Sequence, residues 1–125
     1  MNEQDGRCLM ERHAEAWNAH DVNALLSLMT EDCIYDASAG EFSHGTRSIG
    51  HAELRPVFET IWATFKDARW DEAEHFVFGD RGFSTWTFRG TKPDGKKVEV
   101  MGLDVLRFRD GKICHKNTYR KHLLS

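Results

Sequence analysis

The chain has 125 residues with 17 basic and 20 acidic side chains, a formal net charge of −3. This length suits one domain with one core and leaves no room for a second domain. The slightly acidic balance creates no field that would favour nucleic acid, and no apolar stretch approaches the roughly 20 residues that span a bilayer. We therefore expect one cytoplasmic domain over residues 1–125, with neither a nucleic-acid nor a membrane partner.

The first part of the sequence has the periodicity of two amphipathic helices. Between residues 4 and 19, apolar positions recur at helical spacing, and His13 lies on their face. A lone histidine on such a face is more often a satisfied core residue than a catalyst. Asp21 is a good N-cap for a short second helix. Its predicted buried stripe is Val22, Leu25, Leu26 and Met29.

A third helix follows a short strand and a loop. The strand is predicted at residues 33–36, and the loop at 37–50 is rich in glycine and serine. Loops beside a rigid scaffold often line functional sites. The helix is predicted at residues 51–65 from the strongest helical stripe in the chain. That stripe consists of Leu54, Val57, Phe58, Ile61, Trp62 and Phe65.

The second half of the chain predicts long antiparallel strands. Strands at 69–78 and 83–91 are separated by Gly-Asp-Arg-Gly, and a Pro-Asp-Gly turn follows them. Two more strands fill residues 96–120, joined at Asp110-Gly111, because these residue types supply the positive φ angles of a tight hairpin. Helices first and a meander afterwards indicate an α+β domain. In it, a curved, mixed but mostly antiparallel sheet wraps the three helices.

Asp104 stands on an apolar face of the first of these two strands. Side chains alternate along a strand, so its face also carries Gly102 and Leu106 and no other charge. Burial without a partner disfavours the ionised carboxylate, which predicts a raised pKa and makes Asp104 the first candidate catalytic residue. Gly102 leaves room for a ligand oxygen beside it. The alternative is a structural carboxylate in a buried ion pair.

The opposite face of the same strand is apolar. It carries Met101, Leu103 and Val105, which point away from the predicted helices. We expect this outer face of the sheet to form a homodimer.

Metal ligands show no local pattern in the sequence. The seven histidines include no pair two, three or four residues apart. We expect no cofactor, and a metal site only through assembly in space.

The order of these elements resembles the nuclear transport factor 2-like superfamily, which includes ketosteroid isomerases and SnoaL-like polyketide cyclases. The most specific stretches are WNAHD at 17–21, TEDCIYD at 30–36 and GLDVLRFRDGKI at 102–113. The resemblance covers nearly the whole chain. It implies a cone-shaped, barrel-like sheet around a hydrophobic cavity, whose chemistry differs from member to member.

The resemblance also implies roles for single residues. Asp104 falls where ketosteroid isomerases have the protonated aspartate of the oxyanion hole, and His13 falls near their oxyanion-hole tyrosine. Their general-base aspartate falls at or beside Asp36, and the most direct match is Ala37. The base therefore stays open between Asp36 and His13.

In SnoaL-type cyclases the catalytic aspartate would fall near Lys116 or Thr118, neither of which is a carboxylate. The fold implies an apolar wall suited to a flat or ring-shaped hydrophobic ligand. The candidate substrate-binding residues are Trp17, Tyr35, Phe58, Trp62, Trp86, Phe88, Gly102 and Lys116.

Three functions compete. The first is a small pocket enzyme for cofactor-independent acid–base chemistry, an isomerase, cyclase or dehydratase acting on a hydrophobic carbonyl compound. The second is a non-catalytic module that binds a small hydrophobic molecule, and the third is a dimeric assembly domain. Convergence of Asp104, His13 and Tyr35 on one cavity favours the enzyme, whereas a solid interior favours assembly.

Overall fold

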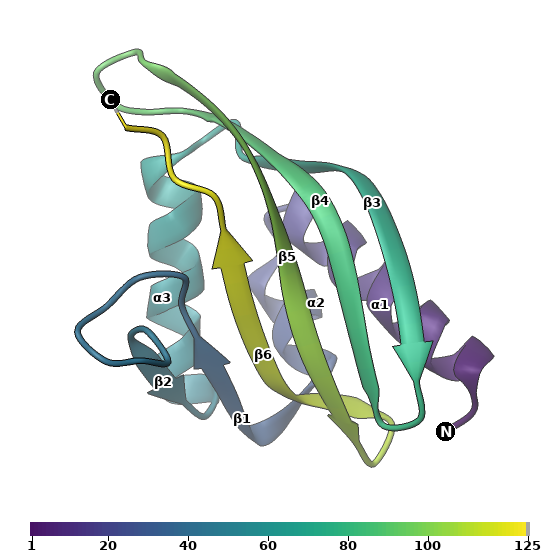
Figure 1. Ribbon diagram of the computed structural model, residues 1–125. Helices are drawn as coiled ribbons and strands as arrows, with labels where there is room; N and C mark the ends of the chain where they lie inside the picture. The colour runs from purple at the N-terminus through teal and green to yellow at the C-terminus, as the bar shows by residue number, and fades with distance from the viewer. Residues whose placement is uncertain (125) are drawn as a thin grey trace.

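The computed structural model describes residues 1–124, which form a layer of three helices against one face of a curved six-stranded sheet (Figure 1). The elements in chain order are α1 (Glu3–Asn18), α2 (Val22–Ser27), β1 (Met29–Asp36), β2 (Arg47–Ile49), α3 (His51–Thr64), β3 (Arg69–Phe78), β4 (Arg81–Thr91), β5 (Lys97–Arg109) and β6 (Lys112–Arg120). The α+β class and the four long strands agree with the sequence-based prediction.

The strand order is β2-β1-β6-β5-β4-β3, and only the β1–β6 pair among them is parallel. The sheet is curved but not closed into a barrel, so β2 and β3 form its edges. Three details differ from the prediction. β4 begins at Arg81 rather than at residue 83. β1 begins at Met29 rather than at residue 33, and β2 lies inside the predicted loop. Three residues are too few to show an alternating pattern.

Local sequence signals fix several ends of these elements. Asn2 and Asp5 form a capping box at the start of α1, and the Asp21 side chain accepts a hydrogen bond from the Ala24 amide at the start of α2. In the β5–β6 turn, Asp110 has φ 54° and Gly111 has φ 74°. The predicted Asp-Gly hairpin is therefore confirmed.

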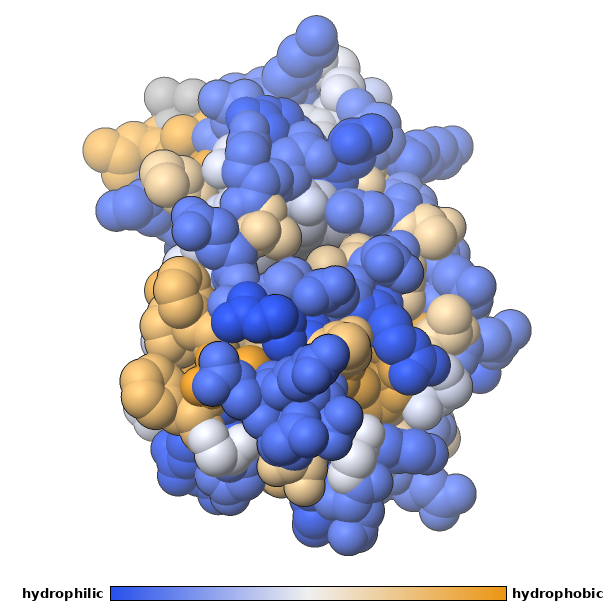
Figure 2. Space-filling model, turned by 90° about the vertical axis from the view of Figure 1, so that its right-hand side faces the viewer, coloured by the Kyte–Doolittle hydropathy of each residue, from blue (hydrophilic) through white to orange (hydrophobic). Residues whose placement is uncertain are grey.

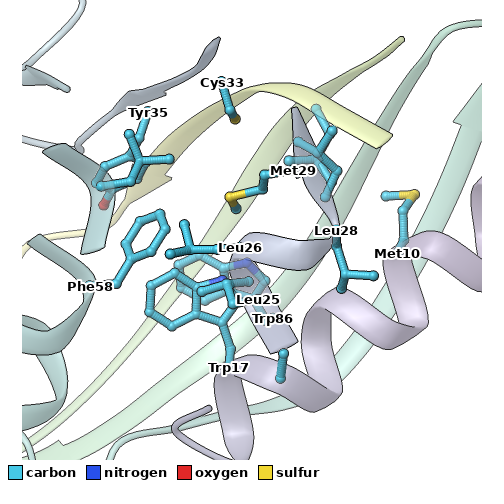
Figure 3. Close-up of a cluster of buried hydrophobic side chains, with 14 of the residues drawn as sticks. Met10, Trp17, Leu25, Leu26, Leu28, Met29, Cys33, Tyr35, Phe58 and Trp86 are labelled. Carbon is cyan, nitrogen blue, oxygen red and sulfur yellow. The ribbon is translucent and has the colours of Figure 1, made fainter. Parts of the chain in front are cut away.

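The core joins α1 to α3 through aromatic side chains (Figure 3). Figure 3 shows Trp17 and Phe58, whose ring centroids lie 4.9 Å apart. The Trp17 ring centroid also lies 5.1 Å from that of Trp62. The indole N–H of Trp62 also donates to the Trp17 carbonyl oxygen at 3.2 Å. These contacts hold the two helices at a fixed separation over the sheet.

The outer face of the sheet carries exposed apolar side chains. Met101 is 62% exposed and Val105 is 37% exposed, and the rings of Phe76 and Phe83 stack across neighbouring strands. Figure 2 shows apolar surface gathered low on the left, the side to which this outer face turns. The predicted outward direction of this face is correct, and the homodimer stays a prediction. In residues 1–124, no helix has the length and apolar character that a membrane crossing requires.

Candidate active site

A cavity of about 510 Å³ opens between helices α1 and α3 and the inner face of the sheet. Most of its wall is apolar. Its polar and charged side chains are His13, Tyr35, Ser38, Thr60, His75, Ser84, Asp104, Lys116, Thr118 and Arg120. Asp104, His13 and Tyr35 therefore do converge on one cavity, the arrangement that favours a pocket over a solid interior.

Four polar side chains form a row across the sheet beneath this cavity. His75 pairs with Ser84, Ser84 with Asp104 and Asp104 with Thr118 in directly opposite positions on β3 to β6. His75 Nδ1 lies 2.7 Å from Ser84 Oγ, and Thr118 Oγ1 donates to Asp104 Oδ1 at 2.6 Å. Residues in such a register share one face of the sheet, so the row presents its polar atoms together.

Asp104 is ionised in a buried ion pair. Its Oδ2 lies 2.9 Å from Lys116 Nζ and accepts a hydrogen bond from the Trp86 indole at 3.1 Å. Burial acts to raise the pKa of Asp104, but the charge of Lys116, with help from the Thr118 hydroxyl, outweighs it and lowers the pKa. The prediction of a raised pKa for Asp104 was wrong. It assumed that the carboxylate has no partner, whereas Lys116 on the neighbouring strand pairs with it.

Lys116 reaches the cavity because of a β-bulge in β6. Arg109 pairs with Lys112 and Phe108 with Ile113, but Arg107 pairs with His115, so Cys114 is an extra residue. A one-residue shift moves every later side chain to the other face of a strand. The bulge thus turns Lys116 and Thr118 inward.

His13 is a neutral imidazole at the floor of the cavity. The Trp17 indole donates to its Nε2 at 3.0 Å, and because indole is only a donor, the ring proton lies on Nδ1. Lys116 Nζ lies 3.5 Å from the same Nε2. Burial, followed by the charge of Lys116, lowers the pKa of His13 to about 3. His13 is therefore a weak base that helps to position Lys116.

His75 is a cavity residue that the sequence analysis missed. Its side chain is half-buried, and burial lowers its pKa, so the ring is neutral near pH 7. Nδ1 contacts Ser84, whereas Nε2 makes no hydrogen bond to the described residues. The sequence analysis predicted a four-residue turn before the second strand, whereas the structure has a shorter turn that pairs Phe78 with Arg81 and places His75 opposite Ser84.

Asp36 lies outside the cavity. Arg47 donates to its carboxylate at 2.7 and 3.0 Å, and His115 Nε2 lies 2.8 Å away. The Arg47 hydrogen bonds, against the opposing effect of burial, lower the pKa of Asp36. The next residue, Ala37, directly follows β1 and does line the cavity.

The other predicted substrate-binding residues divide into two groups. Those that line the cavity are Trp17, Tyr35, Trp86, Phe88 and Lys116. Burial raises the pKa of Tyr35 to about 12, so its hydroxyl keeps its proton.

Phe58, Trp62 and Gly102 lie outside the cavity wall. Phe58 and Trp62 are buried behind Trp17 in the core. A Cβ on Gly102 would lie 2.6 Å from the Trp86 ring, so the space expected for a ligand oxygen is occupied by the indole.

Among the described residues, no group of three or more His, Cys, Asp or Glu side chains is arranged to hold a metal ion. The polar groups of the cavity can instead donate hydrogen bonds and transfer protons.

Solved structures share this fold along nearly the whole chain. A proposed polyketide cyclase from Xanthomonas campestris pv. campestris is 22% identical, with a TM-score of 0.85, covering 95% of this chain and 92% of that one. TerC, co-crystallised with polyporic acid, is 18% identical, with a TM-score of 0.80 and coverages of 94% and 92%.

A third structure is a hypothetical protein with a ketosteroid isomerase-like fold from Catenulispora acidiphila DSM 44928, in complex with trimethylamine. It is 19% identical, with a TM-score of 0.78 and coverages of 94% and 86%. Similarity at this level of identity shows that the chain shares the fold of these proteins. It does not show that the chain shares an activity with them.

No curated protein matches the chain. The family model of the SnoaL-like domain, in contrast, matches residues 10–116, which include both partners of the buried ion pair. This chain therefore belongs to the SnoaL-like domain family.

Proposed function

We propose that this chain is a small pocket enzyme that performs cofactor-independent acid–base chemistry on a hydrophobic carbonyl compound, of the isomerase, cyclase or dehydratase type. One observation carries the proposal. The Lys116 ammonium has three N–H donors. Asp104 Oδ2 accepts one at 2.9 Å, whereas the lone pair of His13 Nε2, 3.5 Å away, already accepts from the Trp17 indole. At least one donor is therefore available to a ligand oxygen.

A carbonyl oxygen that accepts this hydrogen bond becomes easier to convert to an enolate. Lys116 is only 4% exposed, and a charge in such a water-poor site acts more strongly on a developing oxyanion than it would in water. Asp104 keeps the ammonium charged and oriented, and His13 holds it from the other side. Both are therefore positioning residues in this mechanism.

His75 is the candidate base. Its neutral ring lies at the β3 end of the row formed by His75, Ser84, Asp104 and Thr118, and its Nδ1 contacts Ser84. Nε2 takes the proton from the carbon next to the carbonyl group, and the electron pair of that C–H bond moves onto the oxygen held by Lys116. Return of the proton at a different carbon gives an isomer, and attack of the enolate on a second carbonyl group gives a ring.

Ligands named for the fold neighbours support a small-molecule cavity. TerC was co-crystallised with polyporic acid, and the Catenulispora protein is in complex with trimethylamine. For a further neighbour, AclR from Streptomyces galilaeus, a hydroxylase activity has been proposed. Aromatic side chains at this cavity, including Trp17, Trp86 and Phe88, suit a ring-shaped ligand.

A non-catalytic binding role is the second candidate. It is favoured by the pKa of His13, which is lowered to about 3, and by the lowered pKa of Asp104, because both groups are then weak bases. The two candidates differ in whether a ligand proton is removed.

Deuterium exchange at the carbon next to a carbonyl group tests this difference without knowledge of the final product. We expect the protein to accelerate exchange into 2-tetralone or a similar cyclic ketone in D₂O, followed by NMR. Lys116→Met should reduce the rate by about 10²-fold, the scale of losing one oxyanion donor. Lys112→Met is the matched control, because Lys112 is exposed on the same strand.

His75→Gln should slow the exchange as well, without weakening ketone binding. Binding of cyclic ketones without any exchange would support the non-catalytic module. Equal rates for the Lys116 and Lys112 variants would contradict the role given to Lys116.

A further inference from the structure

Three charged side chains line the cavity, and their charges do not sum to zero. They are Asp104, Lys116 and Arg120. Asp104 and Lys116 cancel each other in their ion pair. His13 and His75 are neutral near pH 7, because burial lowers the pKa of both. The cavity therefore carries one net positive charge, at Arg120.

Arg120 is the last residue of β6 and lies at the cavity wall. Its guanidinium carbon lies 5.0 Å from the centre of the Phe88 ring, and it forms no ion pair with any residue of 1–124. Arg120 is an exposed residue, and its contact with the Phe88 ring removes only part of the hydration of its guanidinium group, which lowers its pKa without removing its charge. A partly desolvated cation without a counter-charge favours binding of an anion.

Tyr35 supplies a second donor on the wall of the same cavity. Burial raises the pKa of Tyr35 to about 12, so the phenol keeps its O–H. A guanidinium fork and a hydroxyl on the wall of one cavity suit the two oxygens of a carboxylate.

We propose that the ligand of this cavity is a hydrophobic ring compound with one anionic oxygen group, a carboxylate or an acidic enol, bound by Arg120 and Tyr35 while its rings lie against Phe88 and Trp86. The inference rests on the proposed function only in taking this cavity as the ligand site. It adds the charge of the substrate and the residue that selects it.

Two probes of nearly the same shape test the inference. 2-Naphthoate carries a carboxylate where 2-acetylnaphthalene carries a neutral acetyl group. By isothermal titration calorimetry near pH 7, we expect the protein to bind 2-naphthoate about 10-fold or more tightly than 2-acetylnaphthalene, the scale of a hydrogen bond to a charged group. Added salt should weaken only the binding of the anion.

Substitutions test which residue causes the preference for the anionic probe. Arg120→Gln should abolish it and leave 2-acetylnaphthalene binding unchanged, whereas Arg120→Lys should keep part of it. Tyr35→Phe should reduce naphthoate binding by a smaller factor. The matched control is Arg12→Gln, since Arg12 is exposed on α1, lies outside the cavity wall and forms no ion pair within 1–124. It should change neither affinity.

Equal affinity for the two probes, or a preference that survives Arg120→Gln, would overturn the inference. Exchange of ketone protons without anion preference would then leave the proposed function intact. Anion preference without any exchange would support this inference and contradict the enzyme. Absence of binding by both probes would overturn the inference together with the ligand site on which it rests.

Discussion

Lys116 Nζ and Asp104 Oδ2 lie 2.9 Å apart, and each residue is only 4% exposed. The pair joins β6 to β5 across the floor of the cavity. Two charges in such a place are stable only together, because each alone would be buried without a counter-charge. The pair thus has a structural and a chemical role, which substitutions can separate.

Removal of one partner should destabilise the protein more than removal of both. Asp104→Asn leaves the Lys116 cation buried, and we expect a loss of about 3–5 kcal/mol in the free energy of unfolding. Adding Lys116→Met to that variant should recover most of the loss. Urea denaturation monitored by circular dichroism measures both effects.

The surface pair of Asp32 and Arg109 provides the control, since both side chains are more than half exposed. Asp32→Asn should cost far less than Asp104→Asn, because solvent screens that pair. If the Asp104 single variant and the double variant were equally stable, the two buried charges would not be coupled.

Stability should fall as the pH is lowered from about 6.5 towards 4. The pKa of His13 falls from 6.5 in the unfolded chain to about 3 in the fold, so the unfolded state binds a proton that the folded state does not. Unfolding is then favoured by up to about 1.4 kcal/mol per pH unit below 6.5. His75, whose pKa is also lowered, adds to the same trend.

The lowered pKa of Asp104 acts at more acidic pH. Its contribution is complete above the ordinary value of 3.8 and is lost as the pH falls through its lower folded value. His13→Asn should therefore flatten the stability profile between about pH 6.5 and pH 4.5. His122→Gln is the control, because His122 is exposed. A profile unchanged by His13→Asn would contradict the buried neutral imidazole.

Ala37→Asp should increase proton exchange. Ala37 lines the cavity, whereas the neighbouring Asp36 is held by Arg47 and His115 on the other side of the strand. A carboxylate at position 37 would add a base to the same cavity as Lys116, and we expect a rate gain of about 10-fold or more near pH 7.

Ala39→Asp is the matched control for this gain, since Ala39 is exposed and lies outside the cavity wall. NMR of 2-tetralone in D₂O compares the two variants with the unmodified chain. The same gain from both substitutions would mean that the new carboxylate acts from solvent rather than in the cavity.

Leu103→Glu should separate a dimer without loss of secondary structure. The outer face of β5 carries Met101, Leu103 and Val105, and a like charge from each copy would meet at a symmetric interface. Light scattering at micromolar concentration measures the mass, with Ile49→Glu as control on the distant strand β2. A monomer before any substitution would refute the dimer.

The sequence by itself determined the three helices, the four long strands and the faces of α3 and β5. The stripe of the third helix, the N-cap at Asp21 and the Asp-Gly turn each act through contacts a few residues apart, so a linear reading detects them. Alternation along β5 likewise placed Asp104 inward and Met101 outward, because a strand has only two faces.

The cavity chemistry depended on contacts that the chain order does not reveal. An unbroken β5–β6 hairpin would place Asn117 opposite Asp104 and turn Lys116 outward. The extra residue at Cys114 instead places Thr118 opposite Asp104 and Lys116 opposite Leu106. β6 pairs on one side with β5 and on the other with β1, and both pairings are irregular at this point. The tertiary structure therefore decided the partner of Asp104, and with it the sign of its pKa shift, because one residue of register exchanges the two faces of a strand.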